Sequence, residues 1–167
     1  MTPENETESV EKRSWPKIRA AAAIVALIGL ADSIYLTVHH YTAEPVPCSL
    51  IEGCESVLTS PYAEIGGIPL AAFGAAAYFV AFSLAVLAAY GDDRMWLLFG
   101  LQTILMSAVS ALLIYLQAAV IGAFCQFCLL SAATTFTLYI LYLVTVFQKA
   151  RSTPQQVGES DRDMQAN

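Results

Sequence analysis

Four cysteines have the spacing that points most directly to chemistry, and they form two close pairs, Cys48 with Cys54 and Cys125 with Cys128. The second pair is a C-x-x-C motif at the predicted start of an apolar helix, where unpaired backbone N–H groups and the helix dipole stabilise an anion. Because the thiolate is the reactive form of cysteine, this position favours redox chemistry. The alternative is a structural disulfide or a pair of buried thiols. Several pairings of the cysteines are possible, and the sequence does not choose among them.

The first pair lies in a connection rich in turn residues and is followed by a helical pattern. Pro45, Pro47 and Gly53 flank this pair and favour an irregular backbone. The residues that follow have the spacing of a short amphipathic helix that would lie on the membrane surface. Its apolar side would carry Cys54, Val57, Leu58 and Pro61. This helix would turn Cys54 toward the bundle and leave Cys48 exposed to soluble partners. The alternative is a disulfide that only holds the connection in place.

Metal binding and nucleic-acid binding have less support. Zinc ligands usually occur at C-x2–4-C spacing in small polar knuckles, whereas here one cysteine pair begins a membrane helix. We therefore predict no metal. The sequence has no basic stripe with interleaved aromatic residues, so nucleic acid is not an expected partner.

The elements that must position the cysteines are membrane-spanning helices. The chain is 57% hydrophobic and only 13% charged. About 20 apolar residues are enough for a helix to cross the hydrocarbon core of a bilayer. We expect an all-α membrane protein, a four-helix bundle at residues 18–148, with spans at 18–40, 68–90, 95–121 and 125–147 and an outer loop at 41–67. The polar tails, residues 1–17 and 149–167, are expected to be disordered.

The positions of the basic residues predict the orientation. All eight lie toward the two ends of the chain or, as Arg94 does, in the short turn between the second and third spans. The 41–67 loop and the turn before Cys125 contain none. By the positive-inside rule, both termini are cytoplasmic and both cysteine pairs share the outer face, where disulfides form and persist. We therefore expect a multi-pass protein of the cell membrane, surrounded by lipid.

Several motifs together resemble the bacterial vitamin K epoxide reductase family. The segment 48–78 carries most of the resemblance, through the first cysteine pair, Ser60, Gly67-Ile68-Pro69, Gly74 and Tyr78. The C-x-x-C that opens the last span belongs to the same pattern. So does the stretch Gly29–Thr37 of the first span, which includes Asp32 and Tyr35. The resemblance covers about residues 20–147.

The resemblance implies a route for electrons. A reduced thioredoxin-fold protein on the outer face gives electrons to Cys48, and Cys54 passes them to Cys125. Cys128 then meets a quinone of the ubiquinone, menaquinone or vitamin K type, and the net result is new disulfide bonds in exported proteins. Many bacterial relatives carry a fused thioredoxin-like domain after the last span, whereas this chain continues with only a short polar segment, so the partner is expected to be a separate protein.

Further residues are expected to serve the quinone. Small residues in the second and fourth spans open a slot for a flat ring, although small residues also simply let membrane helices pack closely. The predicted quinone-binding residues are Cys128, Ala132, Pro69, Gly74 and Tyr78. Asp32, a carboxylate inside the first span, is a candidate proton group, and the alternative is a protonated Asp32 bonded to a neighbour such as Ser33. Ser60 and Tyr35 are expected supporting residues.

Two other functions compete with this one. The unrelated bacterial four-helix disulfide-forming oxidases also carry two cysteine pairs, but their C-x-x-C lies in the first outer loop, and here the order is reversed. The non-enzymatic alternative is a membrane scaffold whose outer loop is held by a disulfide.

Overall fold

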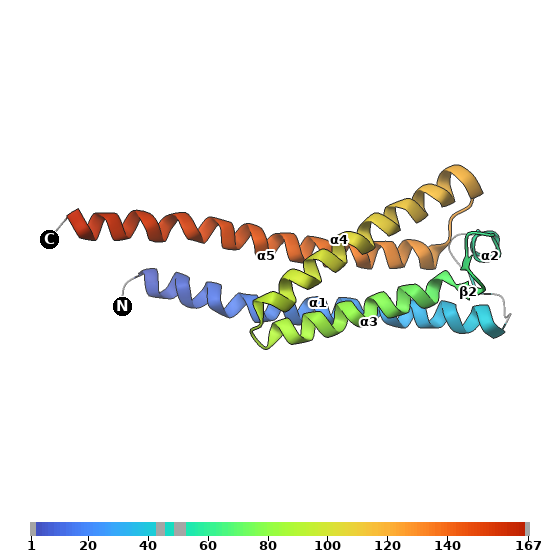
Figure 1. Cartoon of the computed structure of the whole chain (residues 1–167), viewed down its shortest axis with the longest axis horizontal. Coiled ribbons are helices and arrows are strands. Elements are labelled where there is room, and N and C mark those ends of the chain that lie inside the picture. The colour runs from blue at the N-terminus through green and yellow to red at the C-terminus, as the bar shows by residue number, and fades with distance from the viewer. Residues whose placement is uncertain (1–2, 43–45, 49–52, 166–167) are drawn as a thin grey trace.

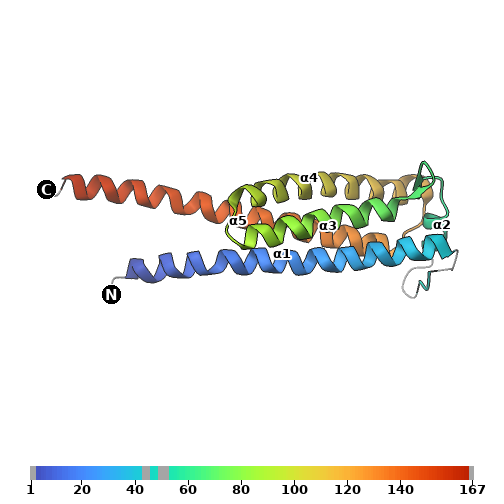
Figure 2. The same cartoon turned by 60° about the horizontal axis from the view of Figure 1, so that its bottom comes forward.

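Long helices run side by side along one axis in the computed structural model, which describes residues 3–42, 46–48 and 53–165 (Figures 1 and 2). Its elements are α1 (Pro3–Thr42), α2 (Cys54–Leu58), β1 (Glu64–Ile65), β2 (Ile68–Pro69), α3 (Leu70–Ala89), α4 (Asp93–Leu116), the π-helical turn η1 (Gln117–Ile121) and α5 (Gln126–Gln165). Within the described residues, four segments are long and apolar enough to cross a membrane: Lys17–Thr42, Leu70–Ala89, Asp93–Ile121 and Gln126–Ala150. The predicted four-helix membrane fold is therefore confirmed.

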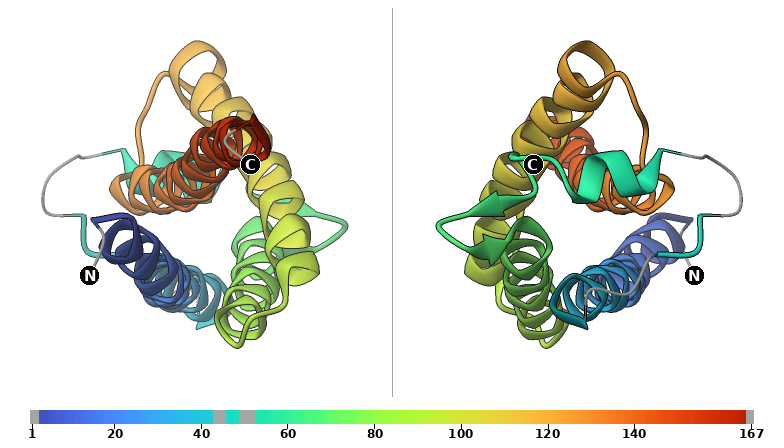
Figure 3. Two further views of the ribbon diagram at one scale, coloured as in Figure 1. Left: turned by 90° about the vertical axis from the view of Figure 1, so that its left-hand side faces the viewer. Right: turned by 90° about the vertical axis from the view of Figure 1, so that its right-hand side faces the viewer.

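The bundle has two different ends. Both chain termini lie at one of them, called the tail end below (Figure 1). The other end, called the cysteine end, carries α2, the two short strands and the turn that leads into α5. Seen along the bundle axis, α2 lies across this end, over the beginning of α5 (Figure 3). The short helix that the sequence predicts is thus present, with Cys54 and Val57 buried.

Small residues set the spacing of the helices. The most extensive contact in the bundle is that of α1 with α3, and α5 packs against both α1 and α4. Ala22 and Ala26 of α1 and Ala81 and Ala85 of α3 are fully buried, and such residues let helix backbones approach closely. From the turn at the tail end that joins them, α3 and α4 diverge toward the cysteine end (Figure 1).

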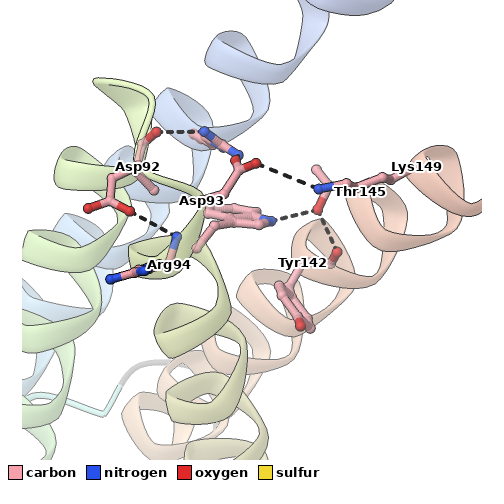
Figure 4. Close-up of polar contacts among 9 residues, drawn as sticks. Asp92, Asp93, Arg94, Tyr142, Thr145 and Lys149 are labelled. Atoms are coloured by element: carbon pink, nitrogen blue, oxygen red, sulfur yellow. Dashed lines mark hydrogen bonds and ion pairs between the residues drawn. The ribbon is translucent and has the colours of Figure 1, made fainter.

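An ion-pair cluster ties the helices together at the tail end (Figure 4). The buried guanidinium of Arg19 on α1 donates to the backbone oxygen of Ala88 at 2.7 Å and to the carboxylate of Asp93 at 2.5 Å. Lys149 of α5 pairs with the other oxygen of that carboxylate at 3.6 Å. These contacts connect α1, α3, α4 and α5 at a single point.

The second span begins at Leu70, close to the start at about residue 68 that the sequence indicates. Strands β1 and β2 pair antiparallel across a turn of Gly66 and Gly67, whose φ angles are 63° and 81°. This left-handed backbone suits glycine and forms a tight hairpin. Pro69 then caps α3 in an extended conformation, so the helix begins at Leu70.

The structure continues two helices of the bundle into the tails, and the disorder expected of the tails stays a prediction. The helix α1 begins at Pro3, and α5 continues to Gln165, so segments 3–17 and 149–165 extend the membrane helices. The physical reason is that an existing helix needs no new nucleus, and each added residue gains one backbone hydrogen bond.

Candidate active site

The C-x-x-C motif opens α5, with Cys125 just before the first helical residue and Cys128 in the first turn. Both are free thiols, and the backbone N–H of Cys128 donates to the sulfur of Cys125 at 3.5 Å. A hydrogen bond from the Cys128 side chain lowers the pKa of the Cys125 thiol to about 7, although burial opposes this change. The backbone N–H groups of Phe127 and Cys128 act in the same direction as the side-chain bond. A substantial fraction of Cys125 is therefore thiolate near neutral pH.

The first cysteine pair forms a disulfide. Cys48 and Cys54 are bonded, with their Cα atoms 6.3 Å apart. Cys54 is almost completely buried, as the sequence predicts. Cys48, which the sequence leaves exposed to partners, is half-buried instead.

All four cysteines meet in one cluster at the cysteine end. Cys54 and Cys125 are buried in its centre, while Cys48 and Cys128 pack against them. Gly53 allows this approach, because a Cβ atom at its position would lie 2.6 Å from the backbone oxygen of Phe124. The backbone of the loop before α2 therefore touches the turn before α5, which brings the two cysteine pairs together.

The turn before α5 is held by a residue that the sequence analysis does not single out, Gln117 of η1. Its backbone oxygen accepts from the N–H of Ala123 at 3.2 Å, and its side-chain oxygen accepts from the N–H of Cys125 at 3.0 Å. In the sequence, Gln117 is an uncharged polar residue within a long apolar run, and such a residue could have been identified as a candidate site residue. That signal is not specific, because Gln102 lies in the same run.

A cavity of about 310 Å³ lies below the cysteine cluster, between the helices. Its lining includes every residue predicted to bind the quinone, together with Ser60: Cys128, Ala132, Pro69, Gly74 and Tyr78. Most of the remaining lining is apolar. Its polar side chains include Ser33, Gln102, Ser110, Gln117, Ser131 and Thr135. Such a mainly apolar cavity with a few polar groups is typical of small-molecule sites.

Tyr78 crosses the bundle from α3 to α5. Its hydroxyl lies 2.7 Å from the hydroxyl oxygens of both Thr134 and Thr135, and it donates to the backbone oxygen of Ser131 at 2.5 Å. Gly29 of α1 leaves room for the ring, since a Cβ atom there would overlap with it. The hydroxyl is thus fixed on α5, one to two turns beyond Cys128.

Asp32 and Tyr35 lie outside the cavity lining, although Ser33 is part of it. Asp32 is buried, and its Oδ2 atom has no hydrogen-bond partner among the described residues. Its carboxylate nevertheless acts on the cysteines through space, because it raises the pKa of Cys125. The centre of the Tyr35 ring lies 5.4 Å from the centre of the Phe127 ring. Phe127 stands between the two cysteines in the sequence of the C-x-x-C.

A contact between a histidine and a carboxylate joins the hairpin to α1 beside the cavity. The Nε2 atom of His40 lies 3.0 Å from a carboxylate oxygen of Glu64 on β1, and His40 belongs to the cavity lining. Ser60 ends α2 by donating to the backbone oxygen of Val57 at 2.7 Å. In the described part of the chain, no three His, Cys, Asp or Glu side chains are arranged as metal ligands.

This arrangement suits thiol–disulfide exchange. A thiolate attacks a disulfide through a mixed-disulfide intermediate, which requires the sulfurs of two pairs to come into contact. The shared cluster provides that proximity for Cys54 and Cys125, and Cys128 connects the cluster to the cavity.

Two comparisons with known proteins agree with this chemistry. A family model described as "Vitamin K epoxide reductase family" matches residues 20–143. The thiol-disulfide oxidoreductase LTO1 of Arabidopsis thaliana is 32% identical over 138 residues, which cover 77% of this chain. The match covers 36% of that relative, so the chain spans only about a third of its length.

Proposed function

Because the chain belongs to the vitamin K epoxide reductase family, we propose that it is a membrane thiol oxidoreductase that takes electrons from a thioredoxin-fold protein and reduces a quinone. One observation carries this proposal: the four cysteines share one cluster, and one of them, Cys128, lines an apolar cavity. The cluster supplies a path for electrons, and the cavity supplies a place for an apolar acceptor.

The proposed reaction proceeds in balanced two-electron steps. The dithiol of the partner reduces the Cys48–Cys54 disulfide and becomes a disulfide itself. The thiolate of Cys54 then attacks Cys125 of an oxidised C-x-x-C, and Cys48 resolves the mixed disulfide, which restores the first disulfide and leaves Cys125 and Cys128 as thiols. Finally, these two thiols form a disulfide and give two electrons and two protons to the quinone, which leaves as the quinol.

The shape of the cavity supports an acceptor that arrives from the lipid. Phe73 of α3 and Leu105 and Val109 of α4 line the cavity and are also exposed on the outside of the bundle. The cavity thus reaches the lipid-facing surface between α3 and α4, the two helices that diverge at this end. A quinone ring would lie beside Cys128 while its apolar tail extends into the bilayer. Ubiquinone, menaquinone and vitamin K all share this chemistry.

The test is quinone reduction by the purified protein with dithiothreitol as the electron donor. The Cys128→Ala variant should lose turnover, because the remaining thiols have no contact with the cavity. The Cys48→Ala variant should lose oxidation of a thioredoxin-fold partner yet keep turnover with dithiothreitol, which can reduce the C-x-x-C directly. Equal loss of dithiothreitol-driven turnover in both variants would contradict the proposal, and so would a wild type that reduces no quinone of any tail length.

The Cys48–Cys54 disulfide also fits the non-enzymatic scaffold with a fixed outer loop. Alkylation of free thiols before and after a brief pulse of reduced partner separates the two functions. A scaffold keeps the same disulfide throughout, whereas a relay passes through states in which Cys48 or Cys54 is alkylated and then returns to the disulfide when quinone is added.

A further inference from the structure

Gln117 is the buried polar side chain that connects the cysteine turn to the cavity. It is only 3% exposed and lies in the π-helical turn η1 between α4 and α5. Its side chain holds the backbone of Cys125, as described above, and it belongs to the lining of the cavity together with Cys128. π-helical turns are rare and are often found at functional sites.

The hydrogen bond to Cys125 determines how the amide of Gln117 is oriented. The backbone N–H of Cys125 is only a donor, so the carbonyl oxygen of the amide must face it. The two N–H groups of the amide then point elsewhere, and no hydrogen bond connects them to another described residue. Because Gln117 lines the cavity, an acceptor on the occupant of the cavity would give these N–H groups a hydrogen-bond partner.

We propose that the amide N–H group of Gln117 donates a hydrogen bond to a carbonyl oxygen of the quinone, while the amide oxygen holds Cys125. This inference rests on the proposed function, and it assigns Gln117 two roles: it binds the acceptor, and it positions the C-x-x-C. A quinone that is bound in this way has its ring in a fixed position relative to the turn before α5 and therefore relative to Cys128. The same bond becomes stronger as negative charge develops on the oxygen during reduction.

Two variants separate the donor from the acceptor. Gln117→Glu keeps an oxygen for the N–H of Cys125 but, when ionised, has no N–H for the quinone. Gln117→Leu loses both bonds. Gln148→Glu is the matched control, because it makes the same exchange at an exposed position of α5 near the tail end of the bundle.

The readouts are the KM for a short-tailed ubiquinone with dithiothreitol as donor, and the rate of Cys125 alkylation in the quinone-free protein. Alkylation is measured well above the pKa of Cys125, so that an altered pKa does not limit the rate. Gln117→Glu should raise KM about tenfold, the equivalent of one lost hydrogen bond, and should leave alkylation unchanged. Gln117→Leu should raise KM similarly and speed alkylation, because the turn that buries Cys125 is released. The control should match the wild type in both.

The outcomes distinguish this inference from the proposed function. An unchanged KM in Gln117→Glu overturns the bond to the quinone, and wild-type alkylation in Gln117→Leu overturns the positioning role. If Gln117→Leu does not fold, Gln117→Glu still decides the first point, and Gln117→Met in its place decides the second. A wild type that reduces no quinone overturns the proposed function and the quinone bond together, whereas the alkylation rates still decide the role toward Cys125.

Discussion

The two thiols of the C-x-x-C have different surroundings, although they are only one helical turn apart. Cys125 lies at the N-terminal end of α5, where it receives hydrogen bonds from the side chain and the backbone N–H of Cys128. It is also fully buried against α2. Cys128 instead faces the cavity. This difference suits Cys125 to exchange with Cys54 and suits Cys128 to contact the acceptor.

The ionisation of Cys125 gives a prediction at this scale. Its pKa is lowered to about 7, so its alkylation should fall as pH drops through that value and the thiolate becomes protonated. Cys128→Ala removes the largest cause of the lowering and should move the midpoint upward, whereas Cys128→Ser keeps a hydroxyl donor and should move it less. Asp32→Asn should move the midpoint downward, because the Asp32 carboxylate raises this pKa. Peptide mapping of alkylated Cys125 across the pH range measures each midpoint, and identical profiles in the wild type and Cys128→Ala would refute the hydrogen-bond explanation.

Among the elements, the short helix α2 decides whether the two cysteine pairs meet. It is only five residues long, so it has little stability of its own and depends on where it docks. Gly53 provides the docking point through its backbone contact with Phe124 and Ala123. Ser60 and the hairpin then lead the chain from α2 into α3.

The docking of α2 predicts the effect of Gly53→Ala. In a Cys128→Ser background, the Cys125 thiolate can attack the Cys48–Cys54 disulfide and release Cys48, and no Cys128 thiol is present to displace Cys54 from Cys125, so a Cys54–Cys125 disulfide should accumulate. Adding Gly53→Ala should sharply lower its yield, because the new methyl group would overlap with a backbone oxygen and α2 would have to shift at a cost of about 1–3 kcal/mol. Non-reducing peptide mapping measures the yield. Ser56→Ala, on the exposed side of α2, is the control and should not change it. Equal yields with and without Gly53→Ala would show that this contact does not position Cys54.

At the scale of the whole molecule, the bundle is tied at one end and open at the other. Arg19, Asp93 and Lys149 join the helices at the tail end, and Trp96 adds a hydrogen bond to Thr145 of α5 at 2.8 Å (Figure 4). At the cysteine end, α3 and α4 separate and the cavity lies between them and their neighbours. The bundle thus combines an end held by ion pairs with an end that contains the cavity.

The positions of the basic residues predict the orientation of the whole molecule. Both tails should be cytoplasmic, since the loops at the cysteine end contain no Lys or Arg. A reporter enzyme that is active only outside the cytosol should give no signal when fused after Asn167, and it should give a signal when inserted in the 41–67 loop. A strong signal from the fusion at Asn167 would reverse the orientation and place the cysteines in a reducing compartment.

The sequence was sufficient for the features that depend on local composition. Apolar runs alone predict membrane helices, because a bilayer demands long uncharged segments whatever their partners are. The spacing of Cys54, Val57 and Leu58 likewise predicts which face of α2 is buried, since that face follows from helical geometry. The residues that the sequence analysis assigns to the quinone line one cavity, while their role in binding a quinone stays a prediction.

Only the tertiary structure decided which distant groups touch. The contact of Gly53 with Phe124, the bond from Cys125 to Gln117 and the bonds of Tyr78 to α5 each join residues from different elements. No periodicity records such contacts, because they depend on how far one helix is shifted and rotated against another. The same holds for the start of α3, which follows a hairpin turn and Pro69. The hydropathy of the sequence therefore determines the helices, whereas the packing of separate elements against one another determines the site.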